Sequence, residues 1–245
     1  MVLPASGAKP APVVYDALGD SYASGYGVPP YAACGRSDAA YAVQVDGRKH
    51  IALDDFVACA GATTATLVSG GQLNSLDAGT GLVTIQIGGN DIGWSSVVGA
   101  CLIGSDAQCA GALKASLATV TTVLPARLQS VYAQVATRAP GAAVLVVGYP
   151  RLFSPEYGSY LGASPAEKQA LNDGADTLNG VLQHAATAAG FTFVDVTHRF
   201  VDHGVNAPEP WVTGAFDPAA FHPNALGYAA YTGAVTSAAK PQLLR

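Results

Sequence analysis

Ser21 is the first residue of the chain whose surroundings could support catalysis. It stands in the stretch VVYDALGDSYASGYG, residues 13–27, where a short apolar run ends abruptly in Gly19, Asp20 and Ser21. Gly, Asp and Ser are also the usual residues of ordinary turns, so this stretch alone has a purely structural explanation. The alternative is a serine placed at the end of a strand, at the edge of a sheet, to act as a nucleophile. Such a hydroxyl needs a neighbouring imidazole to take its proton.

Three further stretches contain residues that this chemistry requires: ACAGATTATL, IQIGGNDIGW and AFHPNALGYAAY. The first contains Gly61, the second contains Asn90 and the third contains His222. Attack on an ester carbonyl builds negative charge on its oxygen, and preorganised N–H donors must stabilise that charge. Glycine suits a position where the main chain approaches a substrate closely. A serine, a histidine and such donors would together form a site for ester cleavage.

Five apolar runs rich in Val, Ile and Phe alternate with segments of helical pattern, which indicates an α/β sandwich with a parallel sheet. Almost continuously hydrophobic runs suit strands that are buried on both faces. The expected strands are Val13–Gly19, Phe56–Ala60, Leu82–Gly88, Ala143–Gly148 and Phe191–Val196. Ligands of open parallel sheets bind outside the carboxyl ends of the strands. Ser21, Gly61 and Asn90 each follow one of these strands, so we expect them at one edge of the sheet.

The expected helices have their own sequence signals. One apolar stripe steps by three or four residues, and Pro125 should kink or split it: Leu113, Leu117, Val120, Leu124, Leu128, Val131 and Val135. A capping box at Ser164–Glu167 predicts a helix start, and Gly190 is well placed to end that helix. A last helix is expected over Ala225–Ala238. Irregular loops are expected over residues 26–36, 92–110, 149–163 and 197–221, and sites usually form on such loops.

Composition limits the class of protein. The chain has 245 residues, of which half are apolar and only 12% are charged, with a formal net charge of −5. We expect one domain over residues 13–245, after a flexible leader over residues 1–12, and a monomer. No cluster of Lys or Arg occurs in the sequence, so nucleic acid and anionic membrane surfaces are poor partners. No apolar run reaches the about 18 residues that a transmembrane helix needs.

The four cysteines form two pairs that are close in the sequence. Pairing Cys34 with Cys59 and Cys101 with Cys109 is the simplest of the three possible connectivities. Zinc binding is the rival interpretation, but the sequence has no C-x-x-C pair and no histidine close to these cysteines. Two disulfides predict an exported, extracellular protein. We expect neither a bound metal nor a cofactor.

The four stretches together resemble the SGNH hydrolases, also called GDSL-type esterases and lipases. That family is named for a serine, a glycine, an asparagine and a histidine, which Ser21, Gly61, Asn90 and His222 match in order. The resemblance spans residues 19–228 and is greatest to secreted actinomycete lipases and phospholipases A1, whose local cysteine pairs are also similar. It implies a flavodoxin-like, three-layer α/β/α sandwich around a mainly parallel, five-stranded sheet.

The resemblance also implies a role for each matching residue. Ser21 would be the nucleophile and His222 the general base. The backbone N–H groups of Ser21 and Gly61, together with the side-chain amide of Asn90, would bind the oxyanion.

The sequence departs from the family pattern at the group that orients the histidine. The family usually has an aspartate three residues before the histidine, but Ala219 stands there. A literal Asp-x-x-His match occurs at Asp195–His198, at the end of an expected strand and without a following proline, so we interpret it as a chance match. We expect a carbonyl of Ala219 or Ala220 to accept the Nδ1–H of His222, as in relatives that use a Ser–His dyad. Asp217 is the rival acceptor.

The loops expected near the site are aromatic and apolar: they contain Tyr26, Tyr31, Trp94, Tyr149, Tyr157, Tyr160, Trp211, Phe216 and Phe221. Some of these residues belong to the core, and others could line a groove for an acyl chain, because apolar ligands bind in hydrophobic clefts. The candidate site residues and the resemblance to the SGNH hydrolases together predict a secreted serine esterase or lipase that cleaves acylglycerols or phospholipid acyl esters. A carbohydrate acetyl-esterase, an acyltransferase and a silent lipid- or carbohydrate-binding module on the same fold are the alternatives.

Overall fold

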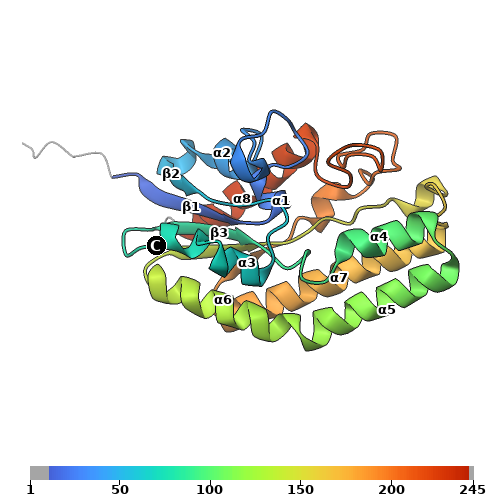
Figure 1. Ribbon diagram of the computed structural model, residues 1–245. Coiled ribbons are helices and arrows are strands. Elements are labelled where there is room, and N and C mark those ends of the chain that lie inside the picture. Colours follow the sequence, from blue (N-terminus) through green and yellow to red (C-terminus); the bar gives the residue numbers. More distant parts are fainter. Residues whose placement is uncertain (1–10, 243–245) are drawn as a thin grey trace, which may run out of the picture.

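A computed structural model describes residues 11–242 as a three-layer α/β/α sandwich (Figure 1). Five parallel strands form the central sheet in the order β2-β1-β3-β4-β5. This is the fold class expected from the alternation of strands and helices. The leader expected over residues 1–12 falls almost wholly outside the described residues, so the domain boundary at residue 12 stays a prediction.

The strands largely coincide with the apolar runs, with one exception. They are β1 (Val13–Gly19), β2 (Ile51–Phe56), β3 (Leu82–Gln86), β4 (Ala143–Val147) and β5 (Thr192–Val194). The prediction of a strand over Phe56–Ala60 was wrong, because β2 ends where that run begins. β2 is an edge strand, and its exposed Asp54 and Asp55 interrupt the apolar pattern. Charges of this kind are common on edge strands, where one side of the strand faces solvent.

Eight α-helices occur within residues 11–242: α1 (Ser21–Ser24), α2 (Tyr41–Val45), α3 (Thr64–Ser69), α4 (Trp94–Ile103), α5 (Asp106–Thr122), α6 (Leu124–Arg138), α7 (Pro165–Ala188) and α8 (Ala225–Gln242). α2 and α8 cover one face of the sheet, and α3, α6 and α7 cover the other (Figure 1). α4 and α5 pack on α7 toward the side to which the strands point.

The helix boundaries follow local sequence signals. Pro125 lies in the first turn of α6, and α5 and α6 meet at a 44° bend, so the apolar stripe is split as expected. The capping box of Ser164 starts α7, which ends two residues before Gly190. Within the described part of the chain, no single helix is long and apolar enough to cross a membrane, and α5 and α6 meet that criterion only as a bent pair.

The segment expected as an irregular loop over residues 92–110 is largely helical. α4 occupies most of it, and α5 begins at Asp106. The buried residues of α4 are Val97, Val98, Cys101 and Leu102. Their spacing of three and four residues is the signal that could have identified this helix from the sequence.

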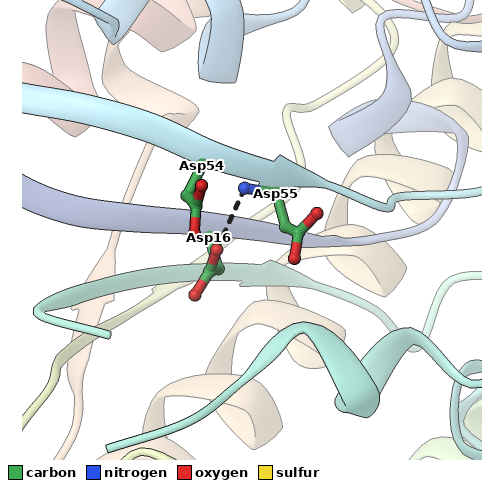
Figure 2. A group of neighbouring side chains, drawn as sticks. All are labelled: Asp16, Asp54 and Asp55. Atoms are coloured by element: carbon green, nitrogen blue, oxygen red, sulfur yellow. Dashed lines mark hydrogen bonds between the residues drawn. The ribbon is translucent and has the colours of Figure 1, made fainter. Parts of the chain in front are cut away.

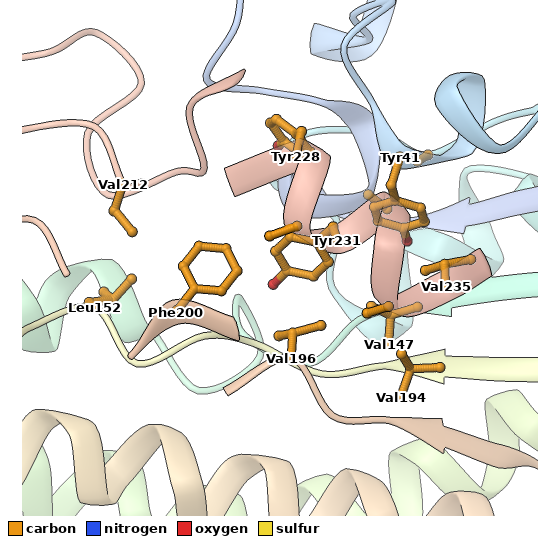
Figure 3. Packing of buried hydrophobic residues seen from close by; sticks show 14 of the residues in the cluster. Tyr41, Val147, Leu152, Val194, Val196, Phe200, Val212, Tyr228, Tyr231 and Val235 are labelled. Carbon is orange, nitrogen blue, oxygen red and sulfur yellow. The ribbon is translucent and has the colours of Figure 1, made fainter. Parts of the chain in front are cut away.

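Buried apolar residues form one cluster on each face of the sheet. Figure 3 shows part of the first cluster, where Tyr228 and Tyr231 of α8 lie among side chains that include Val147 of β4 and Val194 of β5. The ring of Tyr231 stacks on that of Tyr41 in α2, with 5.7 Å between their centroids. The two clusters pack the helices against both faces of the sheet. This packing fixes the positions of the strand ends at which the site is built.

Both expected disulfides are present. Cys34 pairs with Cys59, which joins the loop after α1 to the loop after β2. Cys101 pairs with Cys109, which joins α4 to the first turns of α5. Cys59 stands two residues before Gly61, so the first of these bonds constrains a loop that borders the site.

Candidate active site

Ser21 lies where β1 ends and α1 begins. Gly19 has a φ of +142°, and a Cβ atom there would lie 2.3 Å from the backbone oxygen of Gln86, so only glycine fits this turn. Asp20 caps α1 by accepting a hydrogen bond from the Tyr22 N–H at 2.9 Å. The turn holds Ser21 at the wall of a pocket, where the residue is 8% exposed.

His222 reaches Ser21 from the loop that precedes α8. Its Nε2 atom lies 2.7 Å from Oγ of Ser21. Its Nδ1 atom lies 3.1 Å from the carbonyl oxygen of Ala219 and 3.0 Å from that of Ala220. Because carbonyl oxygens can only accept hydrogen bonds, the proton belongs on Nδ1. Nε2 is therefore free to accept the hydrogen bond of the Ser21 hydroxyl.

Asp217 does not occupy the position at Nδ1. Its side chain is exposed, and Oδ1 accepts a hydrogen bond from the Ala219 N–H at 2.7 Å. The carboxylate thus stabilises the turn that presents the two carbonyl groups to the imidazole. The Asp195–His198 match does not line the pocket of Ser21. Its aspartate accepts a hydrogen bond from the Thr197 N–H at 2.8 Å and so orders a local turn.

The surroundings of His222 favour the neutral imidazole. Burial lowers the pKa of His222 below its ordinary value of 6.5, because the charged form loses solvation. The carbonyl groups of Ala219 and Ala220 and the charge of Asp217 oppose this shift without reversing it. At pH 7 the imidazole is therefore unprotonated at Nε2, which is the form that can act as a base.

Gly61 and Asn90 line the same pocket as Ser21 and His222. Gly61 has a φ of +81°, in the left-handed region that favours glycine, although a side chain there would meet open space. One N–H of the Asn90 amide donates to the Ala62 carbonyl at 2.9 Å. This bond fixes the plane of the amide and connects the loops after β2 and β3. The amide carries a second N–H that a ligand in the pocket can use.

Tyr149 has a structural role that its residue type did not reveal. Its hydroxyl donates to Oδ2 of Asp20 at 2.5 Å and accepts a hydrogen bond from the Gly89 N–H at 3.2 Å. It therefore connects the serine turn to the loop that contains Asn90. Burial raises the pKa of Asp20 to about 7, although its hydrogen bonds oppose the shift.

Thr213 supports the histidine loop and was also missed from the sequence. Its N–H donates to the carbonyl of His222 at 2.8 Å, and its hydroxyl donates to the carbonyl of Ala219 at 2.5 Å. The N–H of His222 lies 3.2 Å from the same hydroxyl oxygen. A single threonine in a loop carries no pattern that would identify such contacts from the sequence.

The pocket in front of Ser21 has a volume of about 330 Å³. Apart from its polar residues the pocket is lined by apolar side chains, which include Val98, Pro150, Leu152, Ala175, Leu178 and the aromatic residues Trp94 and Phe221. Of the nine aromatic residues expected near the site, Tyr26, Trp94, Tyr149 and Phe221 line it. Trp211 instead stacks on His203, with 3.7 Å between the ring centroids. α4 and α7 form the two apolar walls of the pocket.

Three carboxylates on β1 and β2 form a group whose geometry could hold a cation. The ligand atoms of Asp16, Asp54 and Asp55 lie within 4.8 Å of one another (Figure 2). The buried Asp16 already accepts hydrogen bonds from the Asp55 N–H at 3.1 Å and the Thr80 hydroxyl at 2.6 Å. The register between β1 and β2 shifts between Tyr15 and Asp16. We interpret Asp16 as the side chain that accepts a main-chain hydrogen bond at this irregularity of the β1–β2 pairing.

A serine hydroxyl bonded to a neutral imidazole, at the carboxyl edge of a parallel sheet, is the arrangement of a serine hydrolase. Residues 17–230 match the model of the GDSL-like lipase/acylhydrolase family, and the chain belongs to this family. Its members are carboxylic ester hydrolases, which confirms the resemblance and the enzyme class predicted from the four stretches.

Individual relatives agree with this assignment. The chain is 38% identical over 220 residues to Lipase 1 of Streptomyces coelicolor, with 87% of this chain and 81% of the relative covered. The crystal structure of phospholipase A1 from Streptomyces albidoflavus has a TM-score of 0.86 at 36% identity, covering 93% of this chain and 99% of that one. The extracellular lipase of Streptomyces rimosus has a TM-score of 0.86 at 34% identity, covering 92% and 99%. These similarities confirm the fold class.

Proposed function

We propose that this protein is a secreted hydrolase of lipid carboxylic esters, acting on acylglycerols or on phospholipid acyl esters through Ser21 and His222. The observation that carries the proposal is the 2.7 Å contact between Oγ of Ser21 and Nε2 of His222 at the wall of an apolar pocket. Relatives named as lipases and a phospholipase A1 support the substrate class. The two disulfides and an extracellular relative support secretion.

In the first proposed step, Oγ of Ser21 attacks the ester carbonyl carbon while Nε2 of His222 takes the hydroxyl proton. The carbonyl electron pair moves onto oxygen and gives a tetrahedral intermediate. The imidazolium keeps its Nδ1–H on the carbonyl oxygens of Ala219 and Ala220, whose partial negative charge stabilises it. It then gives the Nε2 proton to the leaving alkoxide as the ester C–O bond breaks. The acyl group remains on Ser21.

In the second proposed step, water replaces the departed alcohol. His222 takes a proton from the water as its oxygen attacks the acyl carbon. The bond to Oγ then breaks, and the imidazolium returns the proton to Ser21 while the carboxylic acid leaves. An acceptor alcohol in place of water would give acyl transfer by the same residues.

We assign the developing oxyanion to three donors, namely the backbone N–H groups of Ser21 and Gly61 and Nδ2–H of Asn90. All three residues line the pocket that His222 also lines. The Ser21 N–H lies in the first turn of α1, whose following N–H is capped by Asp20. Rigid donors of this kind stabilise negative charge without reorganising during the reaction, which is the largest single contribution in many enzymes.

We place the acyl chain between α4 and α7, against Trp94, Val98, Ala175 and Leu178. These side chains line the pocket beside the proposed catalytic residues. The volume of about 330 Å³ lies at the lower end of the roughly 300–1,000 Å³ typical of small-molecule sites. A carbohydrate acetyl-esterase would need a shallow, polar site instead, so the apolar walls favour a lipid substrate.

The proposal is tested by covalent labelling followed by substrate profiling. A fluorophosphonate should label the wild-type protein and should not label the Ser21→Ala variant. A series of p-nitrophenyl esters of increasing chain length then measures acyl preference, and fatty-acid release from phospholipid and triacylglycerol emulsions measures the natural ester class. Failure to label the folded wild-type protein would favour a silent binding module. Activity confined to acetyl esters would favour a carbohydrate esterase.

A further inference from the structure

Tyr22 connects the two halves of the site. Its hydroxyl donates a hydrogen bond to the carbonyl oxygen of Phe221 at 2.5 Å. Its ring centroid lies 5.1 Å from that of His222. Tyr22 directly follows Ser21, and Phe221 directly precedes His222. The sequence neighbours of the proposed nucleophile and base are therefore bonded to each other.

Phe221 has a strained backbone. Its φ of +63° lies in the left-handed region, which costs energy for a bulky residue and persists only where surrounding contacts hold it. The Phe221 N–H donates to the Thr213 carbonyl at 3.1 Å, and the Phe221 carbonyl accepts the Tyr22 hydroxyl. The peptide groups on both sides of Phe221 are thus held. Rotation at Phe221 would turn the peptide that leads into His222 and would move the imidazole.

The carbonyl groups that accept the Nδ1–H of His222 cannot fix the histidine loop relative to the serine turn. Ala219 and Ala220 belong to the same loop as His222, so their carbonyl groups orient the ring within the loop and move with it. The Tyr22 hydrogen bond crosses from the serine turn to the histidine loop, and so it fixes one relative to the other.

Tyr22 is itself well placed to act as a rigid donor. Its N–H is bound by Asp20 at 2.9 Å, and its ring lies edge-on to Tyr149 at a centroid distance of 5.2 Å. Burial raises the pKa of the Tyr22 hydroxyl well above its ordinary value, so it stays protonated and can donate at all working pH values.

We propose that Tyr22 is a positioning residue, which holds Phe221 in its left-handed conformation and thereby aims Nε2 of His222 at Oγ of Ser21. The inference rests on the proposed function, since it assigns a role within the same site. Tyr22 also lines the pocket, so a direct effect on the substrate is the competing explanation that the test must separate.

The first test is the Tyr22→Phe variant, which keeps the ring and removes the hydroxyl. We expect kcat to fall about 10- to 100-fold, because a displaced catalytic group loses reactivity steeply with distance. KM should stay within about twofold, since binding is not the function that is lost. The rate of fluorophosphonate labelling should fall in parallel with kcat. Unchanged kcat, or a rise in KM alone, would overturn the proposal.

Tyr132→Phe is the matched control for loss of a buried tyrosine hydroxyl. Tyr132 lies on α6, and its hydroxyl has no hydrogen-bond partner among the described residues. We expect its kcat and KM to equal those of the wild-type protein. Thermal unfolding of both variants establishes that they are folded. Labelling of the wild-type protein is measured beside them, because its absence would refute the proposed function rather than the role of Tyr22.

The second test separates backbone support from substrate contact. Asn enters the left-handed region far more readily than Phe, so Phe221→Asn should need less support from Tyr22. We expect Tyr22→Phe to cause a several-fold smaller loss of kcat in the Phe221→Asn background than in the wild-type background. Dividing the loss of kcat in one background by the loss in the other cancels the direct effect of Phe221→Asn on the pocket. Equal losses in the two backgrounds would overturn the proposal.

Discussion

The carbonyl oxygen of Ala220 lies 3.0 Å from Nδ1 of His222, at the position that a carboxylate holds in a Ser-His-Asp triad. Asp217 instead bonds to the Ala219 N–H. We therefore expect Asp217→Ala to lower kcat/KM by less than about tenfold, whereas damage to a triad acid costs about 10⁴-fold. Asp217→Asn, which keeps an oxygen acceptor for that N–H, should be almost unchanged. A thousandfold loss in the asparagine variant would show that the carboxylate acts on the imidazole.

The pH dependence of hydrolysis should report the lowered pKa of His222. Burial lowers this pKa below 6.5, and a protonated imidazole cannot take the Ser21 proton. kcat/KM should therefore rise with increasing pH and level off, with an apparent pKa below 6.5 on the acidic limb. Initial rates with a soluble short-chain ester between about pH 4 and 9 measure this limb. An apparent pKa above 6.5 would contradict the effect of burial described for the free protein.

Asp20 should make the protein less stable as the pH rises. Burial raises its folded-state pKa to about 7 from the ordinary value of 3.8, so the folded state prefers the protonated carboxyl. Its stabilising contribution is fully present below about pH 3.8 and is lost as the pH rises through about 7. Asp20→Asn keeps a cap acceptor and cannot ionise. Its free energy of unfolding in urea should fall less than that of the wild-type protein over this pH range, and identical slopes would refute the assignment.

Asn90→Ala should affect the chemical step more than substrate binding. The substitution removes the only side-chain donor that we assign to the oxyanion, so kcat should fall about 10²- to 10³-fold with little change in KM. Asn90→Asp keeps the size of the side chain but loses the N–H groups and adds negative charge, so its loss should be at least as large. Steady-state kinetics on one ester decide the point. A loss of kcat below about tenfold in both variants would exclude Asn90 as an oxyanion donor.

Ala175→Leu should shorten the preferred acyl chain. Ala175 lines the wall that α7 contributes to the pocket, and a larger side chain there occupies the space that we assign to the acyl chain. The ratio of kcat/KM for a long-chain ester to that for a short-chain ester should fall about tenfold, since a few methylene groups change specificity by this order. Ala188→Leu, on an exposed position at the end of the same helix, is the control. An unchanged ratio in Ala175→Leu would place the chain elsewhere.

Local residue patterns predicted the parallel sheet because four of its strands lie within apolar runs of the sequence. The same reasoning misplaced β2, whose exposed Asp54 and Asp55 belong to an edge strand. It also assigned α4 to a loop, because Gly93 precedes the helix in place of a capping side chain and Gly99 lies within it. The monomeric state and the domain boundary at residue 12 stay predictions.

The residues proposed for catalysis were found in the sequence because four short stretches, taken in order, resemble the SGNH pattern, and three of them are glycine-containing turns. The contacts that support them join distant segments and leave no such trace. The partners Tyr149 and Asp20 are 129 residues apart, and Tyr22 and Phe221 are 199 apart. Periodicity reveals which face of an element is buried, but it does not reveal which side chain on one loop meets which carbonyl on another.

The hydrogen bond from Asn90 to the Ala62 carbonyl joins the loop after β3 to the loop after β2, so each loop helps to fix the position of the other. In a chimera that takes residues 60–64 from a relative and keeps residues 88–91, the carbonyl group at position 62 would have an orientation that suits a different amide. Exchanging both loops as a single cassette preserves their mutual fit. Directed evolution of acyl preference should accordingly randomise the apolar walls and leave this pair of loops intact.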